Sequence, residues 1–457
     1  MIKPITELRP YQKQILRELR HLPSIALYMS TGTGKTITSL EKFKYNNTSK
    51  LLVICPHSVV EQWKNVITVQ FPEKKILEFK PTWSAQRKNE ELFNKRYTYD
   101  VVVINFEIVH KLENLKKYVN EDWTIIVDEI HRIKSWGTKK KPVITTRAVC
   151  ALSELTPYKA GLTATPTQGR FGGFLEYYPQ LKFLGYTDLS FEEYTSKHAI
   201  MRLAQHQSRT HYELVGYQNV EDIHKVLETI ARRYVSKCED FEAQHNKIYV
   251  DTCKDYKKFV REKALRKGED VVVLNNGARK RIGLKTITTG TILGKNMFDE
   301  SVRIDNNTNK LDWLEDFLKD TEEVVAIFYQ YNVELDNLVR LAKKLNKKYI
   351  LINGATKDKY REINEKDYDL VIGQFQALSE SLDGLHHKCH ICLFFAMPES
   401  SLTYKQALGR IDRIGQKNVP MYYYMLMKGT IDEEIMKMIE NKIEFSEMTL
   451  ERLELEE

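Results

Sequence analysis

The sequence predicts an α/β protein made of two parallel-sheet units with a mostly helical segment between them. Short apolar runs, rich in β-branched residues, alternate with helix-compatible stretches, which is typical of strands that helices cover on both faces. This alternation stops near Gly172, where aromatic and charged residues dominate, and it resumes near Asn309. We therefore expect a first α/β unit over residues 1–171, a mostly helical segment over 172–300 and a second α/β unit over 301–457.

Apolar runs of strand length define the two expected sheets. In the first unit they are Ile25 to Met29, Leu51 to Cys55, Val101 to Ile104, Thr124 to Val127 and Tyr158 to Gly161. In the second unit they are Val324 to Tyr329, Lys348 to Ile352, Leu370 to Ile372, Ile391 to Phe395 and Met421 to Met427. Helices are expected from about Lys35, over Val333 to Leu345 and over Thr430 to Lys442.

The composition excludes several classes of protein. Of the 457 residues, 42% are hydrophobic and 29% are charged, which is the balance of a folded globular chain. No apolar run approaches the ~18 residues of a membrane span, the N-terminus has no signal-peptide pattern, and six cysteines are too few for a disulfide framework. We expect a cytoplasmic monomer without a membrane partner. The net charge of +8 is compatible with a polyanionic partner but does not establish one.

A glycine-rich loop from Met29 to Thr36 is the strongest chemical signal. It follows a predicted strand and precedes a predicted helix, which is the context of a phosphate-binding loop. Its glycines let backbone N–H groups turn toward phosphate oxygens, Lys35 places a positive charge at the β- and γ-phosphates, and the Thr36 hydroxyl suits Mg²⁺. The residues expected to bind ATP here are Thr31, Gly32, Thr33, Gly34, Lys35 and Thr36.

Two carboxylates directly follow the strand Thr124 to Val127. Asp128 at the strand end is expected to hold Mg²⁺, and Glu129 is expected to act as the general base on the attacking water. His131 follows and is expected to connect the nucleotide site to the rest of the protein. Taken alone, such an acidic pair could instead cap a helix. The phosphate-binding loop upstream favours the metal site.

Two further segments suit phosphate chemistry. The hydroxyl residues between Leu162 and Pro166 suit a relay that senses the γ-phosphate, although Thr and Pro are common at strand ends. Arg410 and Arg413 stand three residues apart, so both can lie on one helical face and stabilise charge on a transferring phosphoryl group. A solvated charged helix is the alternative for this pair. We expect the fold to bring the two arginines to the triphosphate.

Together these motifs resemble the superfamily 2 helicase-type motors, and specifically the Swi/Snf-like chromatin-remodeller branch. Leu8 to Gln12 is similar to the adenine-recognition motif, Asp128 to Lys134 matches the extended motif II, and Gln406 to Gln416 is the most branch-specific segment. The resemblance implies two RecA-like lobes of the P-loop NTPase type, with ATP and Mg²⁺ in the cleft between them. It also implies that Arg9, Gln12 and Gln406 contact the nucleotide.

The resemblance implies nucleic-acid contacts as well. Motifs Ia and Ib correspond to Ile54 to Ser58 with Gln62 and Trp63, and to Val103 to Glu107. Motif V corresponds to Ser379 to Leu385, which has fewer glycines and more acid than the family pattern, and the residues after Pro166 also depart from it. The residues expected to touch nucleic acid are His57, Ser58, Gln62, Trp63, Asn105, Phe106 and Ser379.

The activity that the resemblance implies is ATP-driven translocation along duplex DNA without strand separation. No accessory domain is evident, so either a protein partner supplies targeting or the DNA structure itself is recognised. A strand-separating helicase on DNA or RNA, for which the middle segment would have to supply a wedge, is one alternative. A nucleotide-gated DNA-binding scaffold is another, but it has no need of both a general base and an arginine finger.

Other features have simpler explanations. Cys389 and Cys392, near His386 and His387, are expected to pack in the core because no second ligand pair with zinc-like spacing exists. The basic stretches Lys139 to Lys141 and Arg279 to Arg281 suit either phosphate contacts or a solvated face. The aromatic residues Phe171, Phe174, Tyr177 and Tyr178 are expected in the core rather than in a base-stacking platform.

Overall fold

A computed structural model shows two compact units. It describes residues 7–30, 32–80, 82–167, 173–206, 209–235, 241–262, 264–267, 270–273, 277–295, 300–306, 308–356, 358–379, 384–413 and 415–450. The first unit comprises Met1–Ser236 and Lys442–Glu457, and the second comprises Lys237–Asn441. We call them lobe 1 and lobe 2.

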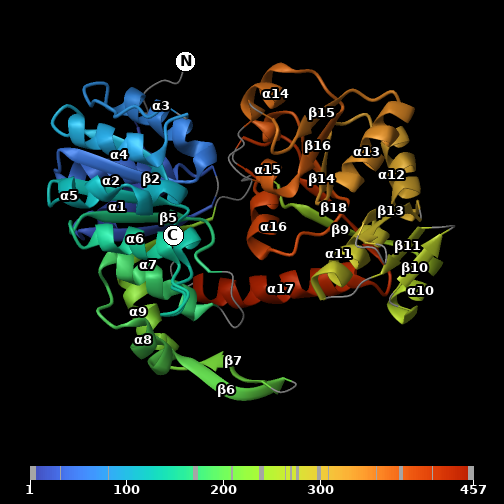
Figure 1. Cartoon of the computed structure of the whole chain (residues 1–457). Coiled ribbons are helices and arrows are strands. Elements are labelled where there is room, and N and C mark those ends of the chain that lie inside the picture. Colours follow the sequence, from blue (N-terminus) through green and yellow to red (C-terminus); the bar gives the residue numbers. More distant parts are fainter. Residues whose placement is uncertain are drawn as a thin grey trace. The chain divides into compact units, whose positions relative to one another are not determined.

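Lobe 1 is built on a six-stranded parallel sheet with the strand order β3-β2-β4-β5-β1-β8. The strands are β1 (Ser24–Met29), β2 (Lys50–Cys55), β3 (Val101–Asn105), β4 (Trp123–Asp128), β5 (Lys159–Thr163) and β8 (Ala231–Tyr234). The α-helices that accompany them are α1 (Pro10–Leu19), α2 (Lys35–Asn46), α3 (Val60–Gln70), α4 (Ala85–Asn94), α5 (Glu113–Tyr118), α6 (Ile144–Ser153), α7 (Tyr177–Leu184), α8 (Phe191–His198) and α9 (Val220–Ile230). Figure 1 shows the lobe 1 strands among these helices.

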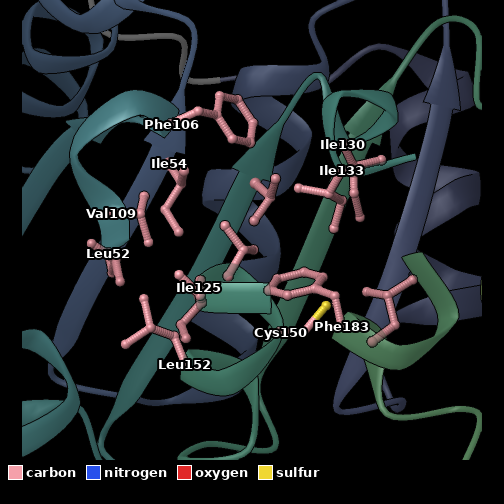
Figure 2. Close-up of a cluster of buried hydrophobic side chains, with 14 of the residues drawn as sticks. Leu52, Ile54, Phe106, Val109, Ile125, Ile130, Ile133, Cys150, Leu152 and Phe183 are labelled. Atoms are coloured by element: carbon pink, nitrogen blue, oxygen red, sulfur yellow. The ribbon is translucent and has the colours of Figure 1, made fainter. Parts of the chain in front are cut away.

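The lobe 1 sheet is buried on both faces because alternate residues of each strand enter different cores. In β2, Leu52 and Ile54 join a core with residues of α6, α7 and α9, whereas Leu51 and Val53 join another core with residues of α1, α2 and α3. Figure 2 shows the first of these cores, in which strand residues meet side chains such as Leu152. Burial on both faces explains why the strands appear in the sequence as continuous apolar runs.

Lobe 2 contains a second six-stranded parallel sheet, with the order β15-β16-β14-β17-β18-β9. Its strands are β9 (Gln244–Val250), β14 (Val325–Tyr329), β15 (Tyr349–Ile352), β16 (Leu370–Gln374), β17 (Ile391–Phe394) and β18 (Met421–Met427). Its helices include α10 (Lys254–Glu262), α11 (Gly277–Thr288), α12 (Asn309–Asp320), α13 (Asn332–Lys344), α14 (Lys359–Glu365), α15 (Phe375–Ser379) and α16 (Ser401–Leu408). α17 (Ile431–Leu450) continues from lobe 2 into the residues grouped with lobe 1. The two sheets confirm the predicted pair of RecA-like lobes.

The segment 172–300 differs from the expectation of a mostly helical insertion with its own boundaries. It contains helices, but it also contains the antiparallel hairpin of β6 (Ala199–His206) and β7 (Arg209–Tyr217). A four-stranded antiparallel sheet, β10-β11-β12-β13, is formed by Ala264–Lys267, Asp270–Val273, Thr291–Lys295 and Ser301–Asp305. The segment also supplies the edge strands β8 and β9 to the two parallel sheets, so the division between lobes falls at Ser236 and Lys237.

Two other expectations concern the chain as a whole. In the part of the chain that the structure describes, no helix has both the length and the apolar character needed to cross a membrane. The described cysteines, Cys55, Cys150, Cys253, Cys389 and Cys392, are all free thiols. Cys389 and Cys392 are buried in lobe 2, as predicted, and no metal-ligating cluster exists among the described residues.

Candidate nucleotide site

The residues of lobe 1 that are predicted to bind nucleotide and metal lie at or beside the carboxyl ends of three adjacent strands. The sheet order places β4, β5 and β1 side by side, and these strands end at Asp128, Thr163 and Met29. The carboxyl edge of a parallel sheet is where α/β proteins bind ligands. The three motifs that are separated in the sequence therefore meet at one edge of lobe 1.

The glycine-rich loop has the backbone that its sequence predicts. Gly32 and Gly34 have φ values of 82° and 79°, a left-handed conformation that glycine adopts without strain. Helix α2 begins directly after the loop, at Lys35, so its N-terminal N–H groups are available to an anion. The Lys35 ammonium donates to the carbonyls of Met29 and Ser30 at 2.8 and 3.2 Å. Of the predicted ATP-binding residues of the loop, Thr31 lies outside the described residues.

The adenine-recognition segment packs against the same loop. The Gln12 amide Nε2 lies 3.2 Å from the Thr33 carbonyl and 3.3 Å from the Gly34 carbonyl, and its Oε1 accepts from the Arg9 backbone N–H at 2.9 Å. A Cβ on Gly34 would lie 2.5 Å from Gln12 Nε2, and the φ of 79° also disfavours any residue other than glycine. The Arg9 side chain is exposed. Gln12 thus connects α1 to the phosphate-binding loop, at the position where the adenine motif is expected.

An aromatic pair that the sequence did not indicate lies beside this segment. Tyr11 donates its hydroxyl proton to the Thr33 carbonyl at 2.9 Å, and its ring stacks on that of Tyr234 with centroids 3.7 Å apart. Tyr234 is the last residue of β8, and its carbonyl accepts from the Ser30 N–H at 2.8 Å. No sequence signal marks Tyr234, because its position depends on the pairing of β8 with β1.

The acidic residues form a hydrogen-bonded cluster with His131 and Thr163. His131 Nδ1 lies 2.8 Å from Thr163 Oγ1 and 3.2 Å from Glu129 Oε2, and Thr163 donates to Glu129 Oε2 at 3.3 Å. Glu129 has a φ of 53°, and the other described non-glycine residues with positive φ are all asparagines. A glutamate in the left-handed region costs about 1–3 kcal/mol, and such strain is typical of functional sites. Thr163, from the hydroxyl segment between Leu162 and Pro166, therefore contacts two residues of the acidic motif directly.

The two carboxyl groups have opposite pKa shifts. Burial and the neighbouring Glu129 charge raise the pKa of Asp128, although a hydrogen bond from Trp63 and the Lys35 charge oppose this. Burial also acts to raise the pKa of Glu129, but hydrogen bonds from His131 and Thr163 and the charge of Lys35 outweigh it and lower that pKa. Glu129 is therefore held as the carboxylate, which is the form that a general base requires.

Asp128 and Thr36 have the chemistry of a magnesium site. Mg²⁺ prefers oxygen ligands and is usually held by one or two protein groups together with substrate phosphates. The Asp128 carboxylate is partly buried next to Glu129, with the Lys35 charge nearby, so a divalent cation would relieve the charge that raises its pKa. These donors fit Mg²⁺ bound with a nucleotide, and the metal would supply charge neutralisation at the phosphates.

The predicted nucleic-acid residues fall into two groups. His57 and Ser58 are exposed in the turn that leads into α3, and Gln62 is exposed in the first turn of that helix. His57 Nδ1 lies 3.2 Å from the Asn105 amide nitrogen. Asn105 is only partly exposed, and its contact with His57 joins the segment that follows β2 to the end of β3. The basic stretches are partly paired, since Lys139 lies 3.4 Å from Glu192.

The other three predicted nucleic-acid residues require correction. Phe106 is 4% exposed and belongs to the core shown in Figure 2. Trp63 is 2% exposed, and its indole Nε1–H donates to Asp128 Oδ2 at 2.8 Å. Ser379 is 1% exposed. The direction of each side chain follows from how its helix or turn docks on a sheet, and the motif pattern does not contain that information.

The predicted arginines are buried within lobe 2. Arg410 donates from Nη2 to the Ser379 carbonyl at 2.6 Å and from Nε to the Gln406 carbonyl at 3.2 Å. Arg410 and Arg413 both lie in the irregular turn after α16, which ends at Leu408, so the expectation that they share one helical face is wrong. The expected approach of these arginines to the triphosphate concerns both lobes and stays a prediction. Gln168 and Gly169 after Pro166, Phe171, and residues 380–383 of motif V lie outside the described residues.

Comparison with known proteins agrees with the lobe 1 site. Residues 5–168 match the family model described as "Type III restriction enzyme, res subunit". The resemblance to superfamily 2 helicase-type ATPases is confirmed for this segment. The matched range contains the adenine motif, the phosphate-binding loop, Asp128, Glu129 and His131. The family model therefore covers the part of lobe 1 in which the nucleotide site is predicted.

One solved structure aligns with nearly the whole chain. It is described as "Sulfolobus solfataricus SWI2/SNF2 ATPase core in complex with dsDNA". The similarity covers 99% of this chain and 98% of that chain, with 17% sequence identity and a TM-score of 0.43.

Proposed function

We propose that this protein is an ATP-dependent translocase on double-stranded DNA, of the Swi/Snf-like type, which hydrolyses ATP between its two lobes. The cluster of Glu129, His131 and Thr163 beside the phosphate-binding loop carries this proposal. It contains an ionised carboxylate positioned by two hydrogen-bonding partners, which is the arrangement of a general base. A binding scaffold would not need such a base.

In our proposal each group of residues has a separate role in ATP hydrolysis. The phosphate-binding loop and Lys35 bind the triphosphate, Gln12 reads the adenine, and Asp128 with Thr36 holds Mg²⁺. Glu129 accepts the proton of the attacking water, and Arg410 and Arg413 of lobe 2 stabilise charge on the transferring phosphoryl group. Cycles of closing and opening of the lobes then move the protein along the DNA backbone.

The exposed residues His57, Ser58 and Gln62, together with the partly exposed Asn105, support the nucleic-acid part of the proposal. Their polar side chains lie at the carboxyl edge of the same sheet that holds the nucleotide residues. Groups of this kind hydrogen-bond to phosphate oxygens and give little base specificity. Contact with the DNA backbone is what a motor that moves over any sequence requires.

Nucleic-acid dependence of ATP hydrolysis tests the proposal. The ATPase rate is measured with no nucleic acid, duplex DNA, single-stranded DNA and RNA. We expect duplex DNA to stimulate most, and Lys35→Ala to abolish turnover. A rate that is indifferent to every nucleic acid would exclude a motor. Release of a triplex-forming third strand, without opening of the duplex beneath it, distinguishes translocation from strand separation.

A strand-separating helicase is the second candidate, and the β6–β7 hairpin is the observation that favours it. The hairpin forms its own two-stranded sheet, and Leu203 and Tyr212 on it are 61% and 71% exposed. A ribbon with exposed apolar side chains has the form of a wedge between base pairs. If wild type opens a forked duplex and Leu203→Ser with Tyr212→Ser removes this activity but keeps ATP hydrolysis, this candidate replaces the translocase.

A further inference from the structure

A buried tryptophan contacts the carboxylate that is proposed to hold Mg²⁺. The Trp63 indole Nε1–H donates to Asp128 Oδ2 at 2.8 Å, and the other oxygen, Oδ1, accepts the Glu129 backbone N–H at 3.0 Å. Each oxygen of this carboxylate thus has a separate donor. Two donors on opposite oxygens determine how the carboxylate plane is rotated about the bond to Cβ. One lone pair on each oxygen remains for a metal or its water ligands.

The fold holds the indole firmly in this position. Trp63 is the fourth residue of α3 and is 2% exposed, and it packs in the core with Ile67, Phe71 and residues of β2 and β3. Long side chains on a helix point back toward its N-terminus. Here that direction leads toward the carboxyl edge of the sheet, where Asp128 lies. A rigid ring with a single donor therefore reaches the carboxylate from outside the acidic motif.

The simpler explanation of the bond between Trp63 and Asp128 is that a buried indole N–H needs a hydrogen-bond acceptor. A buried indole N–H usually finds a partner, and almost any acceptor would serve that purpose. The actual acceptor is the carboxylate at the end of β4, although backbone carbonyls are the commoner partners of side-chain donors. Residues that hydrogen-bond to a metal ligand typically change metal affinity or activity by about 10–100-fold when they are substituted. The two explanations therefore predict different results for the loss of the N–H group.

We propose that Trp63 is a positioning residue for the magnesium ligand, which orients the Asp128 carboxylate through its indole N–H. The reaction that it serves is the proposed ATP hydrolysis, on which this inference rests. Trp63 acts through Asp128 and does not touch the nucleic acid. Its loss therefore affects the metal dependence of the reaction and leaves the DNA dependence unchanged.

Trp63→Phe is the decisive variant because it keeps the buried ring and removes the donor. We expect kcat to fall, or the Mg²⁺ concentration for half-maximal rate to rise, by about 10–100-fold. The KM for ATP should stay within about 2-fold, since the phosphate-binding loop is unchanged. The factor by which duplex DNA stimulates the rate, and the DNA concentration for half-maximal stimulation, should match wild type. Trp123→Phe is the matched control, because Trp123 is also 2% exposed and lies at the opposite end of β4 from Asp128.

Two outcomes would overturn the proposal. If Trp63→Phe keeps the kcat and the Mg²⁺ dependence of wild type, the indole only packs in the core, whatever the change in melting temperature. If instead the variant needs more DNA for half-maximal stimulation and its Mg²⁺ dependence is normal, Trp63 contacts nucleic acid.

A measurement on the unsubstituted side chain covers the case in which Trp63→Phe fails to fold. The chain has five tryptophans, and wild type labelled with 5-fluorotryptophan gives a ¹⁹F resonance for each. The resonances are assigned with single substitutions, and that of Trp63 by elimination if necessary. We expect the Trp63 resonance to shift when Mg²⁺ is added to the ADP-bound protein, and the Trp123 resonance to stay in place. An unmoved Trp63 resonance would contradict the proposal.

The same measurement separates this inference from the proposed function. If wild type binds Mg²⁺ with ADP and the Trp63 resonance shifts, but no nucleic acid stimulates ATP hydrolysis, the translocase proposal fails and the positioning role stands. If hydrolysis is stimulated by duplex DNA and Trp63→Phe is indistinguishable from wild type, the positioning role alone fails.

Discussion

At the scale of the residue, the backbone of Glu129 shows how the site is built. The left-handed φ of 53° turns its side chain toward His131 and Thr163 immediately after the extended strand that presents Asp128. Adjacent residues of an extended strand would point to opposite faces of the sheet. The strained turn instead lets two consecutive carboxylates serve one site with different partners.

Glu129→Gln should abolish turnover and spare ATP binding. The amide keeps the shape of the side chain but cannot accept the proton of water, so we expect kcat to fall by about 10²–10⁴. A coupled ATPase assay measures turnover, and a fluorescent ATP analogue measures binding. Glu90→Gln, which changes an exposed carboxylate of α4, is the control. Normal hydrolysis by Glu129→Gln would show that another group is the base.

A buried lysine in α2 predicts how stability depends on pH. Burial lowers the pKa of Lys42 from its ordinary value of 10.5 to about 8, and its ammonium donates to the Asn46 side chain. Between these two values the unfolded chain binds more protons than the folded chain at this site. The contribution of Lys42 to the free energy of unfolding therefore increases as the pH rises from about 8 to 10.5.

Lys42→Met should remove this contribution. We expect the rise in the free energy of unfolding between pH 7.5 and 9.5 to be smaller in the variant than in wild type by roughly 1–2 kcal/mol, after allowance for the partial screening of the group. Urea unfolding at the two pH values measures the difference. Lys44→Met, an exposed lysine of the same helix that pairs with Glu41, should leave the pH dependence as in wild type. An equal effect of both substitutions would contradict the prediction.

At the scale of the element, a buried ion pair joins the first and last helices of the second α/β unit. Lys310 of α12 donates to Asp432 of α17 at 2.8 Å and to the Phe395 carbonyl at 3.1 Å, and the exposed fractions of Lys310 and Asp432 are 1% and 3%. Asp432 also accepts from the Met427 N–H and from the Thr288 hydroxyl. Helices α11, α12 and α17 thus share one buried carboxylate.

Lys310→Met should destabilise the protein by about 3–5 kcal/mol, because it leaves the buried Asp432 charge without its cation. Lys319→Met is the matched control, since Lys319 is an exposed lysine of the same helix and its pairs are worth about 1 kcal/mol or less. Chemical denaturation of the full chain measures both. Similar small losses for the two variants would mean that the Lys310 pair adds no more than a surface pair. In that case a double variant that also replaces Asp432 should have nearly the same free energy of unfolding as Lys310→Met alone.

At the scale of the whole molecule, the proposed reaction requires both lobes. Lobe 1 contains the glycine-rich loop and Glu129, the proposed general base, whereas Arg410 and Arg413 belong to lobe 2. Arg410 has a role inside its own lobe, because it holds the Ser379 and Gln406 carbonyls. The two arginines should therefore respond differently to substitution.

Arg413→Ala tests whether lobe 2 assists the reaction. We expect turnover to fall by about 10³–10⁵, as for other arginine fingers, with ATP binding preserved. Arg410→Ala should reduce turnover and also lower the melting temperature, because it releases the buried Ser379 carbonyl and the partly buried Gln406 carbonyl. Arg361→Ala, at an exposed pair with Glu365, is the control within lobe 2. Wild-type turnover by Arg413→Ala would mean that lobe 1 hydrolyses ATP without this group.

Much of the fold and of the nucleotide site could be predicted from local sequence. Strands buried on both faces require continuous apolar runs, so the predicted run Leu51 to Cys55 lies within the observed strand Lys50–Cys55. The phosphate-binding loop could be recognised because its backbone demands glycine at Gly32 and Gly34 and its chemistry demands Lys35. Such requirements act within a few residues and therefore remain visible in the sequence.

Tertiary contacts decided what the local pattern did not contain. The residues of β8 (Ala231–Tyr234) and the first four residues of β9 (Gln244–Val250) are mostly polar or charged. Both segments become strands because each pairs with the edge of a sheet built from other parts of the chain. Trp63 and Phe106 lie in motifs that suggested nucleic-acid contacts, but the docking of their elements turned both side chains inward. Pairing partners and side-chain directions depend on residues far away in the sequence, whereas strand patterns and glycine-dependent loops depend on close neighbours.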